Sequence, residues 1–338
     1  MAVEAAKWQW ALGELGFDSV TVAGCGPVDR LLPGLGIGER EPPSRADLTA
    51  ALEDADLVVV ENLCSLPLNP AAGNLVAEAL AGRPAVLHHH DLPWQRPQFA
   101  DHTGPPNDPR WSHVTINELS RRQLAERGIV ATTVYNAFAV RPVPNAGRTD
   151  HHGGEGDRRD QLRRALGVDD GCRLVLQPTR AIPRKNVAGG LRVAAELGAT
   201  YWLLGATEDG FGPELDSLVA AAQCPVILGP PDEEMGFVVD DAYLACDVVA
   251  LPSLWEGFGN PTIESALHRR PLVIGPYPVA REIAAFGFDW FALAETGRLD
   301  TWLGAPDPTL LDSNLAVAGA HFSLRHLPEK IESILPDR

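Results

Sequence analysis

Two glutamates flank a glycine-containing loop that could hold a ligand. Glu256 and Glu264 lie eight residues apart in LPSLWEGFGNPTIESALH, residues 251–268. Gly257 and Gly259 let the backbone approach a ligand closely and adopt dihedral angles that other residues resist. Both carboxylates could therefore address one ligand, and paired carboxylates could suggest glycosidase chemistry from spacing alone.

The end of this loop has the pattern of a helix start. Asn260 is a favourable N-cap residue, and Pro261 suits the first helical position. Free amide N–H groups and the positive end of the helix dipole favour an anion or a ring of sugar hydroxyls. The structural alternative is that Glu264, early in the helix, only complements its dipole.

A basic loop forms the second cluster. The expected strand RLVLQP runs into TRAIPRKN, residues 179–186, and Asn186 then caps a helix. Arg180, Arg184 and Lys185 would gather at the carboxyl end of the strand, where open α/β sheets bind ligands and cations suit a diphosphate. The alternative is a solvated basic loop. Together the two clusters favour a phosphate-bearing ligand more than either does alone. We expect Lys185 and Glu264 to line an open cleft.

The elements that would position these clusters alternate between strand and helix. Short β-branched runs separated by helix-length segments imply parallel sheets, and therefore an α/β fold. We predict strands at residues 20–23, 57–60, 85–88, 113–116 and 132–135, and at 174–177, 201–204, 226–228, 248–251, 272–274 and 291–293.

The chain length and one unpatterned segment indicate two domains. A chain of 338 residues is long enough for about two domains. Residues 141–157 are rich in proline, glycine and charge, as a linker would be. We predict an N-terminal domain of residues 1–155 and a C-terminal domain of 156–322, with a C-terminal helix at 323–338 packing back on the first.

The opening of the chain departs from a doubly wound domain. The helical pattern AVEAAKWQWALGELG comes before any strand, whereas such a domain normally begins with a central strand. We therefore expect the first strand to be missing. Trp8, Leu12 and Leu15 share one helical face, and packing on the sheet is favoured over a membrane-seeking surface.

Composition excludes several classes of partner. The 28 Lys and Arg against 45 Asp and Glu give a net charge of −17, which would repel nucleic acid. No apolar stretch reaches the roughly 18 residues of a membrane span, so we expect no integral membrane contact and a cytoplasmic protein. The five scattered cysteines fit small buried side chains in a reducing compartment.

Three adjacent histidines follow the run PAVL and invite a metal interpretation. Because neighbouring strand residues point to opposite faces, only His88 and His90 could converge, without other obvious ligands. We therefore expect no metal there. Asp54 and Asp56 form an Asp-Ala-Asp sequence, for which a cap or turn role is favoured over a manganese site.

The two clusters in combination resemble the retaining GT-B glycosyltransferases of glycosyltransferase family 4. The Glu256 to Glu264 spacing is similar to the E-x7-E motif of that family, PTRAIPRKN is similar to its Arg and Lys loop, and the resemblance covers about residues 55–335. It implies a GT-B fold, with two Rossmann-like domains facing across a cleft and the N-terminal domain lacking its first strand.

The resemblance also implies roles for individual residues. Arg180 and Lys185 would hold the donor diphosphate, Glu264 would bind the nucleotide ribose, and Glu256 would hold the donor sugar with the amides of residues 257–260. His90 would contact the sugar. The implied catalytic set is Arg180, Lys185, Glu256 and His90, and the implied donor-binding set is Gly257, Phe258, Gly259, Asn260, Thr262 and Glu264.

The expected activity is retaining transfer of a sugar from a nucleotide-sugar to a hydroxyl of a small soluble acceptor. The UDP- or GDP-type donor is a co-substrate, and no cofactor or metal is expected. The alternatives are a non-catalytic nucleotide-sugar-binding homologue or partner subunit, and a sugar-nucleotide epimerase of the same architecture. The base, the sugar, the acceptor and the oligomeric state are left open by the sequence.

Overall fold

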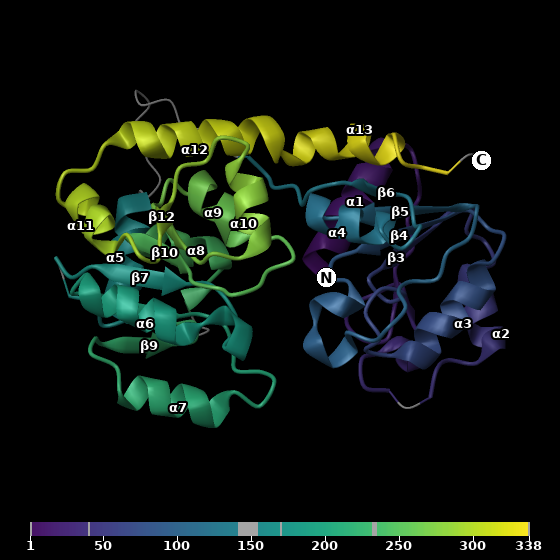
Figure 1. Cartoon of the computed structure of the whole chain (residues 1–338), viewed down its shortest axis with the longest axis horizontal. Coiled ribbons are helices and arrows are strands. Elements are labelled where there is room, and N and C mark those ends of the chain that lie inside the picture. Colours follow the sequence, from purple (N-terminus) through teal and green to yellow (C-terminus); the bar gives the residue numbers. More distant parts are fainter. Residues whose placement is uncertain (1, 40, 141–154, 170, 232–234, 337–338) are drawn as a thin grey trace. The chain divides into compact units, whose positions relative to one another are not determined.

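The chain folds into two compact units. The computed structural model describes residues 2–39, 41–140, 155–169, 171–231 and 235–336 (Figure 1). One unit contains residues 1–137 and 324–338, and the other contains residues 138–323. The predicted linker lies mostly outside the described residues, and its end belongs to helix α5 (Glu155–Ala165).

The first unit is built on a parallel sheet of order β3-β4-β5-β6. Its strands are β3 (Val58–Glu61), β4 (Ala85–His89), β5 (Trp111–Thr115) and β6 (Ala131–Thr133). The strand predicted at 20–23 is reduced to β1 (Val22–Ala23), which pairs with β2 (Arg30–Leu31) in a separate two-stranded sheet. Among the described residues, no strand earlier than β3 joins the four-stranded sheet.

Helices cover both faces of this sheet, which explains why β4 is buried along its whole length. The helices are α1 (Ala2–Glu14), α2 (Arg45–Leu52), α3 (Pro70–Leu80), α4 (Glu118–Ala125) and α13 (Leu327–Glu332). Trp8 and Leu12 of α1 share a core with Ile331 of α13 and with Val86. Helices α2 and α3 pack on the opposite face. The predicted packing of the first helix on the sheet is confirmed.

The second unit has a six-stranded parallel sheet of order β12-β11-β10-β7-β8-β9. Its strands are β7 (Leu174–Gln177), β8 (Thr200–Leu203), β9 (Val226–Leu228), β10 (Val248–Leu251), β11 (Leu272–Ile274) and β12 (Phe291–Ala292). The chain runs outward from β7 to β9 and then returns to the other side of β7 as β10. The carboxyl ends of β7 and β10 therefore meet at a topological switch point, the usual ligand position in open α/β sheets.

Helices again cover the sheet, and the central strands β7 and β10 are fully buried. The remaining helices are α6 (Val187–Glu196), α7 (Gly212–Ala220), α8 (Val239–Ala245), α9 (Pro261–Leu267), α10 (Pro278–Ala284), α11 (Thr296–Gly304) and α12 (Pro308–His321). Figure 1 shows α9 and α12 on one side of the sheet and α6 on the other. Short 3₁₀ helices occupy Pro33–Leu35, Pro93–Gln95, Pro97–Phe99, Pro183–Lys185 and Leu324–His326.

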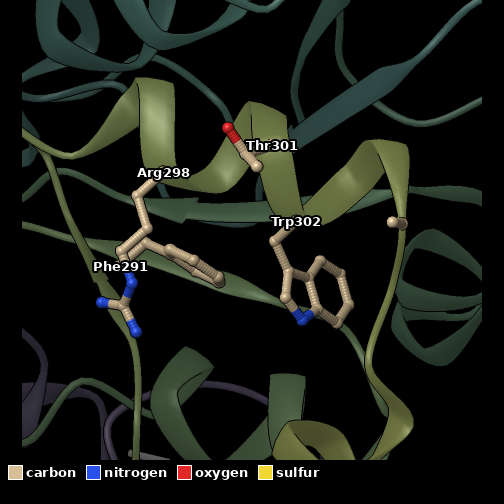
Figure 2. A pocket seen from close by; sticks show the side chains of 5 residues that line it. Phe291, Arg298, Thr301 and Trp302 are labelled. Atoms are coloured by element: carbon tan, nitrogen blue, oxygen red, sulfur yellow. The ribbon is translucent and has the colours of Figure 1, made fainter.

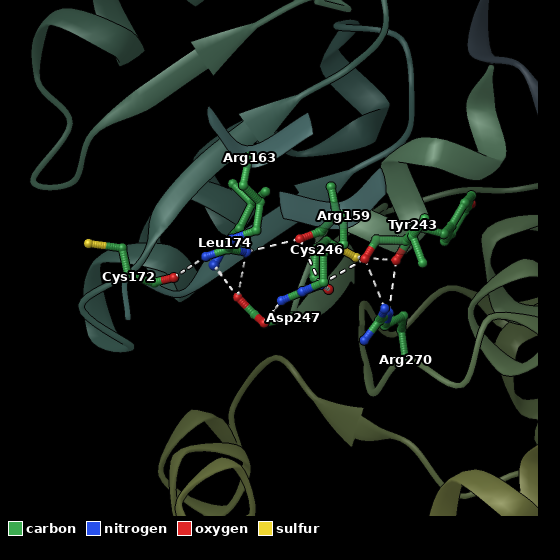
Figure 3. A network of polar contacts seen from close by, with 10 residues as sticks. Arg159, Arg163, Cys172, Leu174, Tyr243, Cys246, Asp247 and Arg270 are labelled. Carbon is green, nitrogen blue, oxygen red and sulfur yellow. Dashed lines mark hydrogen bonds and ion pairs between the residues drawn. The ribbon is translucent and has the colours of Figure 1, made fainter. Parts of the chain in front are cut away.

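Arginines of α5 fix the turn from α8 into β10, as Figure 3 shows. Arg159 donates to the carbonyls of residues 244–246 over 2.7–2.9 Å. Arg163 Nη1 lies 3.2 Å from Asp247 Oδ2, which also accepts a 2.8 Å bond from the amide of Leu174 in β7. Arg270 Nε donates to the Tyr243 carbonyl at 2.8 Å. This network holds α8 in place relative to the two central strands.

The two ends of the second unit lie side by side. The Phe138 amide donates to the Phe322 carbonyl at 2.8 Å, and Phe138 pairs with Ser323 in an isolated parallel bridge. The phenyl rings of Phe138 and Phe322 both lie within 6.2 Å of the ring of Phe258, measured between centroids.

Of the helices in the described part of the chain, none has the length and apolar character needed to cross a membrane.

Candidate functional site

Two loops meet at the switch point of the second unit. One follows β7 and carries Arg184 and Lys185, and the other follows β10 and carries Glu256. The Leu254 amide donates to the Arg184 carbonyl at 2.8 Å. Asn186 caps α6, as predicted, and its Nδ2 also donates to the carbonyl of residue 252 at 3.0 Å. Backbone and side-chain bonds thus hold the two loops together.

An ion pair lies at the centre of this junction. Lys185 Nζ is 2.5 Å from Glu256 Oε1 and 2.6 Å from Oε2, and both residues are buried. Ser253 Oγ donates to Glu256 Oε1 at 2.6 Å, and Arg184 Nη1 lies 3.6 Å from Oε2. Burial lowers the pKa of Lys185, Glu256 opposes the shift, and Arg184 and Arg180 add to it. The structure brings Lys185 and Glu256 together, and the exposed fraction of Lys185 is 7%.

The glycine loop depends on the conformation of Gly259. Its φ is +91°, and a Cβ built there would lie 2.2 Å from the hydroxyl of Tyr277. Asn260 precedes α9 but makes no side-chain cap bond, so its predicted capping role is wrong. Phe258 and Thr262 have buried side chains, and Thr262 Oγ1 donates to the Gly259 carbonyl at 2.8 Å.

Glu264 is oriented by an aromatic residue. The hydroxyl of Tyr243, in α8, donates to Glu264 Oε2. The Tyr243 ring stacks on His268 with centroids 5.0 Å apart and planes 9° apart. Burial and the Glu264 carboxylate raise the pKa of Tyr243 well above its ordinary value, so the phenol stays protonated and donates. Arg180 forms an exposed ion pair with Glu208 at the edge of the basic loop.

The first unit has its own polar cluster, at the carboxyl ends of β3 and β4. Glu61 is the register partner of His88. His88 Nδ1 lies 3.0 Å from Glu61 Oε2, and His90 Nε2 lies 2.7 Å from the same oxygen. The predicted convergence of His88 and His90 is confirmed, with ring centroids 4.5 Å apart. Glu61 is a third partner that the sequence did not reveal.

His89 points to the opposite face of the sheet and belongs to a buried series of side-chain hydrogen bonds. Ser65 Oγ lies 2.5 Å from His89 Nδ1, His89 Nε2 lies 2.9 Å from His113 Nδ1, and His113 Nε2 lies 3.0 Å from Asn107 Oδ1. Because the amide oxygen only accepts, each ring donates through Nε2 and accepts through Nδ1. Burial lowers the pKa of His113 to about 4 and lowers that of His89 well below its ordinary value, so both rings are neutral.

Other predicted groups lie away from these clusters. Asp54 is exposed and lies 3.6 Å from Arg30. All five cysteines are free thiols; two of them, Cys25 and Cys172, are exposed, so the prediction that all are buried is wrong for this pair. A separate pocket in the second unit, drawn in Figure 2, is lined by Phe291, Arg298, Thr301, Trp302 and Ala305, and no predicted site residue lines it.

Sequence comparison finds two curated relatives of low identity, and no protein family model matches the chain. Mannosylglucosylglycerate synthase of Thermotoga maritima is 25% identical, with 85% of this chain and 77% of the relative covered. The enzyme of the same name from Petrotoga mobilis is 26% identical, with 73% of this chain and 66% of the relative covered.

Solved structures match the fold across most of the chain. A glycosyltransferase from Rickettsia africae superposes with a TM-score of 0.69 at 16% identity, covering 98% of this chain and 92% of that one. HepE of Anabaena, crystallised with UDP-glucose, gives a TM-score of 0.64 at 20% identity, covering 86% of this chain and 81% of HepE. The chain therefore has the GT-B fold of such enzymes, with two Rossmann-like α/β units, as the sequence predicted.

Three residues of the candidate sites escaped the sequence prediction. Ser253 is three residues before Glu256, a spacing that brings both side chains to one loop but has no distinctive pattern. Tyr243 reaches Glu264 from another helix, and Glu61 reaches His90 from a neighbouring strand. Such contacts follow from tertiary packing, so the local sequence carries no signal for the last two.

Proposed function

We propose that the chain is a glycosyltransferase that moves a sugar from a nucleotide-sugar donor to a hydroxyl of a small acceptor, with retention of anomeric configuration. The observation that carries this proposal is the buried Lys185–Glu256 pair at the switch point between β7 and β10. Ligands of open α/β sheets bind at such points. A cation beside a carboxylate there suits a ligand that presents both phosphate and sugar hydroxyls.

Each member of the donor site has a proposed role. Lys185, with Arg184 and Arg180, binds the diphosphate, and Glu256 accepts hydrogen bonds from the donor sugar together with the amides of residues 257–260. Glu264, oriented by Tyr243, accepts hydrogen bonds from the ribose. In the first unit, His90 contacts a hydroxyl of the sugar substrate.

The chemistry requires stabilisation of the leaving group. As the glycosidic C–O bond breaks, negative charge grows on the departing nucleoside diphosphate, and preorganised cations lower the energy of that transition state. The acceptor hydroxyl attacks the face from which the diphosphate leaves, and a phosphate oxygen takes its proton. This route needs no enzymic nucleophile. Lys185 and its neighbouring arginines take the place that a divalent metal has in other transferases.

The comparisons guide the choice of substrates. Two relatives are named mannosylglucosylglycerate synthases, which supports mannosyl donors and a small glycerate-containing acceptor as first candidates. The solved complex of HepE with UDP-glucose supports including the UDP series.

The test is release of nucleoside diphosphate from UDP-, GDP- and ADP-sugars, with and without acceptors, in EDTA and in magnesium. We expect one nucleotide series to raise the unfolding temperature and to be turned over only with an acceptor, equally well in EDTA. If a nucleotide-sugar raises the unfolding temperature but no acceptor leads to its turnover, the result would favour a nucleotide-sugar-binding protein. The NMR signal of the anomeric proton shows whether the product retains the anomeric configuration of the donor. An inverted product would refute the proposed retention.

A further inference from the structure

The cluster of Glu61, His88 and His90 is fixed by the pleat of the first sheet. Register places Glu61 beside His88, and alternation places His90 on the same face two residues later. The Trp8 ring of α1 covers His88, with centroids 4.3 Å apart. Asn62 Oδ1 accepts the amide of His90 at 3.0 Å, which fixes the backbone from which the His90 side chain projects.

A metal ion is the first possibility to weigh. The ligand atoms of the three side chains lie within 4.8 Å of one another. However, His88 would have to ligate through Nδ1, which faces Glu61. Its Nε2 would then carry the proton, and this atom is buried with no hydrogen-bond partner among the described residues. Metal-bound histidines almost always donate their second nitrogen to a partner, and a buried unmet donor is costly. The geometry therefore disfavours a metal.

The same observation assigns the protons. A neutral His88 with its proton on Nδ1 donates to Glu61 and leaves Nε2 bare, which avoids the buried donor. His90 Nε2 lies 2.7 Å from Glu61 Oε2, and a carboxylate accepts hydrogen bonds but does not donate them. His90 in its neutral form therefore has its proton on Nε2. Burial raises the pKa of Glu61, but its interactions with His88 and His90 outweigh burial and lower the pKa to about 2, so Glu61 is a carboxylate throughout the neutral range.

The free nitrogen of His90 is then an acceptor. Among the described residues, His90 Nδ1 is not one of the buried polar atoms that lack a hydrogen-bond partner, and the side chain is partly exposed. We propose that Glu61 is a positioning residue that fixes the tautomer and orientation of His90, so that His90 Nδ1 accepts a hydrogen bond from a hydroxyl of the sugar substrate. This inference rests on the proposed function for the identity of the ligand. The arrangement uses the same logic as a carboxylate that fixes a catalytic imidazole.

The decisive variant is Glu61→Gln. Glutamine replaces one of the two carboxylate oxygens by a donating NH₂, which faces His88 Nδ1 in one amide orientation and His90 Nε2 in the other. Where the NH₂ faces His90, Nε2 must become the acceptor and the proton must move to Nδ1. Glu61→Asp keeps a carboxylate and should keep the tautomer. Glu78→Gln, an exposed glutamate of α3 in the same unit, is the matched control.

The experiment measures nitrogen-15 shifts of labelled histidines at pH 8, together with kcat and KM. In the parent we expect the Nε2–H tautomer for His90, assigned with His90→Gln. In Glu61→Gln we expect a shift toward Nδ1–H and a fall in kcat of about tenfold or more, with KM within about threefold. Glu61→Asp should keep the Nε2–H tautomer and have a kcat between those of the parent and Glu61→Gln. A merely structural role would not change the tautomer.

Several outcomes would overturn the inference. They are an Nδ1–H tautomer of His90 in the parent, or an unchanged His90 signal together with an unchanged kcat in folded Glu61→Gln. Uptake of one Zn²⁺ in equilibrium dialysis, lost in His88→Ala, would show instead that the cluster binds a metal. If no sugar is transferred from any donor, the proposed function fails, but the tautomer measurement still decides the role of Glu61.

Discussion

Lys185 Nζ contacts both carboxylate oxygens of Glu256, at 2.5 and 2.6 Å, across 71 residues of sequence. The two residues come from loops after adjacent strands of one sheet, and neither charge has much access to water. Each charge is tolerated in the interior because of the other. The pair therefore contributes to the fold of the second unit as well as to the proposed donor site.

A double-mutant cycle should reveal this coupling. Lys185→Met leaves a buried carboxylate with a weaker partner and should lower the free energy of unfolding by about 3 kcal/mol. Combining it with Glu256→Gln should cost less than the sum of the single changes, with a coupling of about 1–3 kcal/mol. Urea denaturation of the single and double variants measures the loss in free energy of unfolding and the coupling. The exposed pair Arg192→Met and Glu196→Gln is the control, and additive losses at Lys185 and Glu256 would contradict the prediction.

Glu264→Ala should weaken binding of the nucleoside diphosphate by tenfold or more, because a hydrogen bond to a charged group contributes about 1.5–3 kcal/mol. Tyr243→Phe removes the hydroxyl that orients Glu264 and should have a smaller effect in the same direction. Calorimetry with the diphosphate identified by the thermal screen gives the affinities. Glu214→Ala changes an exposed glutamate in the first turn of α7 and should leave affinity unchanged. Equal affinity for Glu264→Ala and the parent would remove Glu264 from the site.

Gly259→Ala should disrupt the glycine loop. Its positive φ disfavours alanine, and the new Cβ would meet the Tyr277 hydroxyl. We expect a loss of more than about 1 kcal/mol in stability together with weaker donor binding. Gly297→Ala, inside α11 with open space around it, should be neutral or stabilising by up to about 1 kcal/mol. A Gly259→Ala protein as stable as the parent would show that the loop tolerates a side chain.

Stability of the first unit should fall as pH decreases from about 6.5 to 4. His113 titrates near 4 in the folded unit but near 6.5 when unfolded, so the unfolded chain binds more protons in this window. Below about 4.5, the unfolded chain also takes up a proton at Glu61, whose pKa in the folded unit is about 2, and this extends the loss. Urea midpoints at a series of pH values test this. His113→Gln can accept and donate as the ring does, and should flatten the upper part of the profile, whereas exposed His102→Gln should not.

Much of the fold could be predicted because it depends on local patterns. Val248–Leu251 forms a fully buried central strand, and such strands appear as continuous apolar runs. The strand predicted at 20–23 is shorter than expected and lies in a separate sheet, because its partner is the short segment Arg30–Leu31. Strand pairing depends on the rest of the chain, and no local pattern states it.

The candidate site was predictable only in part. Lys185 and Glu256 could be singled out from their loops, since cations and carboxylates beside glycines at strand ends suit a phosphate-bearing ligand. Their burial against each other could not be predicted, because it depends on which strands are neighbours. Asn260 was expected to cap α9, but its backbone is already helical, with φ of −45° and ψ of −38°. The residue types at a helix start therefore predict where the helix begins better than they predict a capping hydrogen bond from a side chain.

The order in which the chain supplies its parts has a consequence for synthesis on the ribosome. Residues 138–323 form one unit whose ends meet at Phe138 and Ser323, while α13, which completes the core beside Trp8, comes after them. The later unit can therefore finish folding while the earlier one still exposes the face of α1 that α13 will cover. Contacts between residues so distant in sequence form slowly, and exposed apolar surface favours aggregation. The first unit is thus the part of the chain whose core is completed last.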